Sequence, residues 1–231
     1  MILSHFRRAL AVAVLLGFTV CPSRKAVAQT PAARFVDSAR VEMDRALRDM
    51  DPERIDRTIV MLDRALVAFP DDPYLLHYRG YALYWKAAGA FMGGKKEQAT
   101  PFVKEGLANL AKSAERLPWA ETIQLEASMN GFLIAIDPGN GPTLGPLTGR
   151  LSAEATKLAP DNPRVLLLQA YLAEATPPSM GGGKVRAKEL ASRAVTAFAN
   201  DHPKPLAPAW GKDEAGDMVR RLARADGTGM P

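Results

Sequence analysis

The stretch ALVAFPDDP at residues 65–73 ends one predicted helix and begins the next. Proline is accepted in the first turn of a helix but not in its interior, so Pro70 stops the first helix and Pro73 starts the second. The same pattern of a helix end followed by a helix start recurs as ATKLAPDNP at residues 155–163. A repeated unit of two helices is typical of stacked helical arrays, in which no unit buries its apolar face alone.

A glycine-rich turn is expected one helix after each of these two stretches. It reads MGGK at residues 92–95 and MGGGK at residues 180–184, and a second apolar helix comes next in both copies. We expect glycine to supply left-handed backbone at the end of the preceding helix, with Met92 and Met180 tucked under the turn. Because both turns occupy the same place in the unit, they should lie on the same edge of the stack.

Apolar residues recur with helical spacing along most of the chain, and no segment alternates with period two for long enough to be a strand. We therefore predict an all-α protein of eight or nine antiparallel helices. The expected helices cover roughly residues 30–50, 51–69, 73–90, 95–116, 119–136, 142–158, 163–175, 184–199 and 212–225, with irregular connectors at 137–145 and 201–210.

The helix ends resemble those of the tetratricopeptide repeat family. The second helix of that repeat ends in Ala, an apolar residue, three variable residues and Pro, as residues 65–70 do. Its first helix is matched by Leu76, Gly80 and Leu83. The copies that end at Pro118 and Pro160 match more weakly, and the unit is longer than the family period of about 34 residues.

The C-terminal half is similar to secreted bacterial proteins of this type, through its Gly-Gly-Gly-Lys turn, Phe198 and the sequence PAWG at residues 208–211. The resemblance implies a right-handed superhelix of antiparallel helix pairs over residues 51–225. A capping helix at residues 29–50 would precede it, and residues 226–231 would form a flexible tail.

Residues 1–28 read as an export signal. Arg7 and Arg8 precede a 12-residue apolar run at residues 9–20, and AVA at residues 26–28 fits a cleavage site. The run is too short to span a bilayer, so no transmembrane segment is expected after cleavage. Cys21 leaves a lipid anchor as an alternative, although the residues before it depart from the usual pattern of such sites. We expect a periplasmic or secreted protein.

Charge and cysteine content exclude several classes of function. Four of the 30 Lys and Arg residues and none of the 25 Asp and Glu residues fall within residues 1–28, which leaves 26 basic against 25 acidic residues. This balance gives no reason to expect nucleic acid as a partner. The rest of the chain has no cysteine, which excludes disulfides and thiolate sites there.

The helix expected from Pro73 carries two stripes on opposite faces, one apolar and one aromatic. One face must pack on the repeat core. In the family, the concave face binds peptides, and this likeness makes the aromatic side chains candidates for binding a partner. Together with positions on the aromatic stripe and in the second copy, the candidate set is Tyr74, His77, Tyr78, Tyr81, Tyr84, Trp85 and Tyr171.

Two functions remain open for this face. The protein could be an adaptor that binds a protein or peptide segment of the cell envelope in an open groove. Alternatively, it could bind a small ligand in a pocket lined by Tyr78, Tyr81 and Trp85, with the first helix closing the groove. The aromatic residues could also be plain core beneath that helix. No catalytic, metal or cofactor pattern is present in the sequence, and the acids Glu121 and Glu126 are expected on a solvated face.

Overall fold

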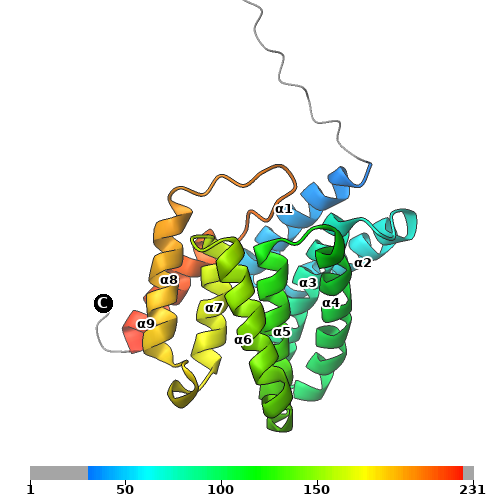
Figure 1. Ribbon diagram of the computed structural model, residues 1–231. Coiled ribbons are helices and arrows are strands. Elements are labelled where there is room, and N and C mark those ends of the chain that lie inside the picture. Colours follow the sequence, from blue (N-terminus) through cyan, green and yellow to red (C-terminus); the bar gives the residue numbers. More distant parts are fainter. Residues whose placement is uncertain (1–30, 226–231) are drawn as a thin grey trace, which may run out of the picture.

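The computed structural model describes residues 31–225, and they form nine α-helices and two short 3-10 helices (Figure 1). The expected export signal, Cys21 and the C-terminal tail lie outside the described residues. The α-helices are α1 (Ala33–Asp49), α2 (Pro52–Ala68), α3 (Pro73–Met92), α4 (Lys96–Arg116), α5 (Ala120–Ile136), α6 (Gly141–Leu158), α7 (Pro163–Ala175), α8 (Lys184–Phe198) and α9 (Lys212–Ala225). The described residues contain no strand, which confirms the all-α prediction.

Side-chain caps explain why α2, α3 and α7 begin where they do. The Asp51 carboxylate accepts a hydrogen bond from the Arg54 amide at 2.9 Å. Asp72 accepts from two amides of α3, each at 3.0 Å, and Asn162 serves α7 in the same way. A proline follows each cap in the first turn, so the Asp-Pro and Asn-Pro marks act as helix starts.

Antiparallel pairs make up the body of the molecule. Helices α3 and α4, α5 and α6, and α7 and α8 pack as consecutive pairs, and α3, α5 and α7 lie side by side (Figure 1). Close approach within the first pair depends on Gly80, because a Cβ atom there would lie 2.6 Å from the Leu110 side chain. At the two ends, α2 is in contact with both α1 and α3, and α9 packs on α8.

The turns after α3, α5 and α7 lie on one edge, as the repeat predicted (Figure 1). Gly94, Gly181 and Gly183 have positive φ, so glycine supplies the left-handed backbone. The expectation that Met92 and Met180 lie under these turns is wrong, since the residues are 76% and 77% exposed. Met92 is the last residue of α3, Met180 ends the 3-10 helix Pro178–Met180, and both side chains face solvent there.

Two further expectations need correction. The segment at residues 137–145, which we expected to be an irregular connector, is mostly helical. A 3-10 helix at Pro138–Asn140 leads directly into α6, which begins at Gly141. The acids of α5 are not on a solvated face. Glu121 is buried and accepts a hydrogen bond from Asn162 at 2.7 Å, because α5 is packed against α4, α6 and α7.

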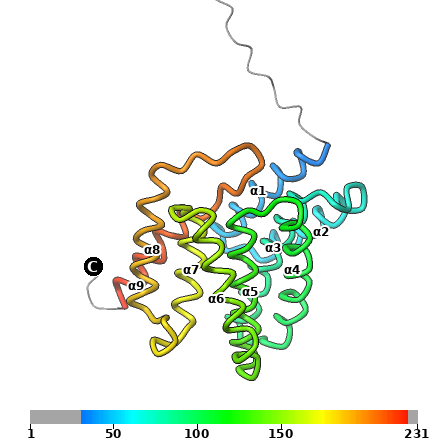
Figure 2. The backbone as a smooth tube through the Cα atoms, viewed as in Figure 1, coloured from blue at the N-terminus to red at the C-terminus, as the bar shows by residue number. Residues whose placement is uncertain are grey.

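A long linker, residues 199–211, joins α8 to α9. It leaves the end of α8, crosses to α1 and returns to α9 (Figure 2). At its start, Asp201 pairs with Arg164 of α7 at 3.1 and 2.5 Å, and the Arg164 side chain is only 2% exposed. The linker is therefore attached to the body of the molecule by a buried ion pair.

We predict that Asp72→Ala lowers the free energy of unfolding by about 1 kcal/mol, because two amides of α3 lose their cap. Asp71→Ala is the matched control, since the neighbouring Asp71 carboxylate makes only an exposed ion pair with Arg116 at 3.3 Å. Urea unfolding of both variants measures the difference. Equal losses for the two would contradict the assigned cap.

Candidate functional site

The two stripes of α3 face different neighbours. Gly80 and Leu83 face α4, while Tyr78 and Tyr81 on the other side are at most 1% exposed. The cover over these tyrosines consists of α1 and the linker 199–211. The Tyr78 hydroxyl donates to the carbonyl of Ala207 at 3.1 Å, and the Tyr81 ring stacks on Trp210 with centroids 4.4 Å apart.

This burial excludes an open groove along the first half of α3 in this structure. Of the three alternatives that the sequence left open for this face, the open groove does not fit His77, Tyr78, Tyr81 and Tyr84, which are all buried. The first helix does close the face, and the linker, which the sequence marked only as a connector, completes the closure. Whether these residues bind a ligand stays a prediction.

His77 lies in the interior of the molecule. Its Nδ1 atom forms a hydrogen bond with Thr122 Oγ1 at 2.9 Å, and its ring contacts Tyr78 and Trp119 edge-on. Burial lowers the pKa of His77 to about 3, so the imidazole is neutral at physiological pH. Tyr74 is half-buried against Trp119, with ring centroids 5.2 Å apart. Both residues therefore serve packing in this structure.

A seam of aromatic rings continues from α3 to α5 and α7. Tyr84 contacts Phe132 with centroids 5.4 Å apart, and Trp85 contacts Tyr171 at 6.0 Å. Trp85, Phe132 and Tyr171 are only partly buried. The seam joins three of the predicted site residues, and it adds Phe132, which the sequence analysis did not single out.

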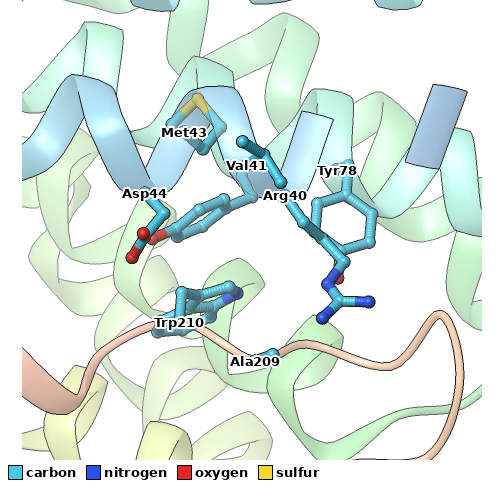
Figure 3. A pocket seen from close by; sticks show the side chains of 8 residues that line it. Arg40, Val41, Met43, Asp44, Tyr78, Ala209 and Trp210 are labelled. Atoms are coloured by element: carbon cyan, nitrogen blue, oxygen red, sulfur yellow. The ribbon is translucent and has the colours of Figure 1, made fainter. Parts of the chain in front are cut away.

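Two cavities flank this seam. The first, about 180 Å³, lies between α1, α3 and the linker (Figure 3). We name it the α1 cavity. It is lined by Arg40, Val41, Met43, Asp44, Tyr78, Tyr81, Ala209 and Trp210. Its walls combine aromatic rings with one basic and one acidic side chain.

The second cavity, about 530 Å³, lies between α7 and α9, and we name it the α9 cleft. It is lined by Tyr171, Glu214, Asp217, Met218, Arg220, Arg221 and Arg224. Arg221 makes a bidentate ion pair with Glu174 at 2.5 and 2.7 Å. The cleft therefore places one aromatic residue opposite three arginines, and its volume lies within the range of about 300–1,000 Å³ typical of small-molecule sites.

Burial dominates the electrostatics of the α9 cleft. It raises the pKa of the Tyr171 phenol, and Arg221 opposes this rise. Burial also raises the pKa of Glu214, and the nearby carboxylates of Asp44, Asp213 and Asp217 raise it further. Asp44 lines the α1 cavity, so Glu214 lies within electrostatic reach of both sites.

Sequence reasoning found the aromatic residues but singled out none of the charged ones that line the two cavities. Arg40 and Asp44 come from α1, and the arginines come from α9. On an isolated amphipathic helix such residues look like an ordinary solvated face, so no local signal marks them. Only the packing of α1 and α9 against the rest of the molecule brings these charged side chains next to the aromatic residues in the two cavities.

Neither a metal cluster nor a membrane-spanning helix occurs within residues 31–225. No group of three or more His, Cys, Asp or Glu side chains there could hold a metal ion. No helix in that range is both long and apolar enough to cross a bilayer.

We predict that Asp201→Ala lowers the free energy of unfolding by about 3 kcal/mol or more, because it leaves the buried Arg164 guanidinium without its partner. Glu189→Ala, which removes an exposed pair with Arg186 at 2.9 Å, serves as the control and should cost under about 1 kcal/mol. Urea unfolding measures both. Similar small losses would mean that the Arg164 pair does not hold the linker.

Glu126 on α5 should make stability depend on pH. Burial, with Glu154 nearby, raises its pKa from 4.5 to about 7, so the folded protein binds the proton more tightly than the unfolded chain. Stability that protonation supplies is present at low pH and is lost as pH rises through about 7. Glu126→Gln should therefore stabilise the protein at a pH above about 7 and have little effect on stability near pH 4. Thermal unfolding across pH checks this, with the exposed Glu115→Gln as the control.

Comparison with known proteins finds a solved structure with a similar fold. No protein-family model matches the chain, and no curated protein matches its sequence. The structure is similar to that of the HusA haemophore from Porphyromonas gingivalis, with a TM-score of 0.64 and 22% sequence identity. The match covers 84% of this chain and 92% of that chain. At this identity the likeness establishes a shared all-helical fold.

Proposed function

We propose that this protein binds haem, or a similar planar molecule with acidic side groups, in the α9 cleft. The observation that carries the proposal is the convergence of Tyr171 with Arg220, Arg221 and Arg224 on one cavity of about 530 Å³. Such a site combines an aromatic wall with basic groups, which suits a ligand that has an apolar ring system and carboxylates at its edge.

The arginines would recognise the acidic groups of the ligand. A guanidinium offers donors in a planar fork that matches a carboxylate. Arg221 already makes this bidentate contact with Glu174, and Arg220 pairs with Asp217. The Arg220–Asp217 pair is exposed, and the Arg221 side chain is 56% exposed although Glu174 is only 24% exposed, so both guanidinium groups are accessible to a ligand carboxylate.

Tyr171 would contact the ligand from the wall of the cleft. A tyrosine oxygen is one of the protein ligands that hold haem iron. Burial keeps the Tyr171 phenol neutral, and a positive metal centre beside it would favour the phenolate instead. Trp85, whose ring contacts Tyr171, extends the apolar surface along the seam.

The fold likeness supports this choice of ligand. The similar solved structure is named a haemophore, and it is matched over nearly all of its length. Binding of a small ligand therefore ranks above the adaptor function. A partner segment bound along the first half of α3 would have to displace α1 and the linker, which cover Tyr78 and Tyr81.

The remaining parts of the proposal concern location, architecture and chemistry. The export signal expected at residues 1–28 supports a periplasmic or secreted protein. The consecutive antiparallel pairs from α3 to α8 support a tetratricopeptide-like right-handed superhelix. We assign no enzymatic activity, because the proposed role needs only binding and release.

Titration with haem, followed by the Soret absorption band, tests the proposal. We expect saturable binding by the wild-type protein. Tyr171→Phe should shift the band and weaken binding at least tenfold, or by about 1.4 kcal/mol, because the phenol oxygen is lost. Arg221→Gln should weaken binding with less change in the band, because the ligand loses a carboxylate partner but keeps its iron contact.

Two matched substitutions serve as controls. Tyr74→Phe removes a half-buried phenol against Trp119, and Arg193→Gln removes an exposed guanidinium on α8. Neither residue lines the α9 cleft, so both variants should bind haem like the wild type. A folded wild-type protein that binds no haem would refute the proposed function. Unchanged binding by Tyr171→Phe would refute the role of the phenol.

A further inference from the structure

The α1 cavity contains buried polar atoms that the protein leaves unpaired. The Trp210 indole nitrogen, the Tyr81 hydroxyl and the Arg40 Nε atom are all inaccessible to solvent, and none has a hydrogen-bond partner among the described residues. Trp210 is 7% exposed and Tyr81 is 1% exposed. Buried polar groups are normally paired, so three orphans around one cavity indicate that something else pairs with them.

The chemistry of these atoms specifies the missing partner. An indole N–H and a guanidinium Nε–H can only donate hydrogen bonds, and a phenol can donate as well. The Trp85 indole is close enough to the Tyr81 hydroxyl to oppose the rise in its pKa, but neither atom makes a hydrogen bond of normal geometry. The cavity therefore requires an acceptor.

Two of the three donors, those of Trp210 and Arg40, face the same part of the cavity. Figure 3 shows the indole nitrogen of Trp210 and the guanidinium of Arg40 on the same side of the cavity, beside Ala209. Tyr81 stacks on the Trp210 ring with an interplanar angle of 13°. Met43 and Val41 from α1 add apolar surface. An acceptor placed beside Ala209 would face the donors of Trp210 and Arg40, and the rest of the molecule would contact apolar side chains (Figure 3).

Arg40 favours an anionic acceptor at its end of the cavity. Arg40 is the basic lining residue, and it pairs with Asp37 through Nη1 at 3.1 Å while its Nε atom stays unpaired. Asp44, the acidic lining residue, pairs with Arg48 at 3.0 Å. A carboxylate near Arg40 therefore gains a charge-assisted hydrogen bond, and Arg48 offsets the repulsion from Asp44.

The size of the cavity limits the ligand. Its volume of about 180 Å³ far exceeds the ~10–15 Å³ that one water needs, but it is below the ~300 Å³ at which typical ligand pockets begin. We infer that the α1 cavity is a second binding site, which takes a small carboxylate-bearing molecule with the carboxylate on Arg40 and Trp210. None of its lining residues lines the α9 cleft, so this site is separate from the proposed haem site.

The indole N–H of Trp210 provides a direct test by NMR. The chain has three tryptophans, so a ¹⁵N-labelled protein gives few indole signals, and Trp210→Phe identifies the one that belongs to residue 210. Benzoate is the probe, and benzamide is its uncharged counterpart with the same ring. We expect benzoate to shift the Trp210 signal saturably and to bind at least tenfold more tightly than benzamide.

Substitutions then locate the contact. Arg40→Gln should weaken benzoate binding at least tenfold, while Arg45→Gln, an exposed position on the same helix, should leave it unchanged. Tyr81→Phe, which removes only the hydroxyl, reports on the third donor. If Trp210→Phe does not fold, Trp85→Phe and Trp119→Phe assign the Trp210 signal by elimination. Haem titration of Arg40→Gln should match the wild type, which separates this proposal from the proposed function.

Three results would overturn the inference. They are the absence of any shift at millimolar benzoate, equal binding of benzoate and benzamide, and equal binding by Arg40→Gln and Arg45→Gln. The first would mean that bound water alone pairs with the donors. The second would mean that the cavity accepts the ring without recognising the carboxylate, and the third would mean that Arg40 does not bind the carboxylate.

Discussion

The buried ion pair between Arg164 and Asp201 fixes the point at which the linker leaves α8. A guanidinium that is 2% exposed needs a compensating charge, and Asp201 supplies it through two hydrogen bonds. The same arginine lies beside the other end of the linker, where Gly211 has φ of +105° and a Cβ atom would lie in tight contact, 3.0 Å from Phe198 and 3.1 Å from Leu167. Both ends of the linker are thus held at one place on α7 and α8, and the chain between them must loop outward.

That loop reaches α3 and determines what its aromatic face can do. Trp210 covers Tyr81, and the carbonyls of Leu206 and Ala207 accept from Tyr78. Leu206 adopts φ of +65°, which is uncommon for a residue with a side chain. The docked conformation therefore has a backbone cost, which the ring contact and the tyrosine hydrogen bonds offset.

The helices could be predicted from the sequence because their signals are local. Caps and prolines at Asp72-Pro73 and Asn162-Pro163 act within a few residues, and most of the expected boundaries agree with the structure to within one or two residues. The burial of the α3 tyrosines could not be predicted in the same way. It depends on a linker about 130 positions away in the sequence, which has no periodicity to show where it packs. The exposed Met92 and Met180 illustrate the same limit. The glycine residues of each turn can be recognised from a few neighbouring positions, but the sequence does not show whether another element packs over the turn.

The two covers over the aromatic face differ physically, and this difference bears on how ligands enter. Helix α1 buries Val36, Ala39 and Met43 almost completely, and its small alanines allow its backbone to approach α3. Its backbone hydrogen bonds are also internal to the helix. The linker has no continuous series of internal backbone hydrogen bonds, and few of its residues are buried. Local opening is easiest where buried contacts and protected hydrogen bonds are fewest, so the linker is the weaker of the two covers. A ligand for the α1 cavity would therefore enter on the side of Ala209 and Trp210, while α1 remains a fixed wall.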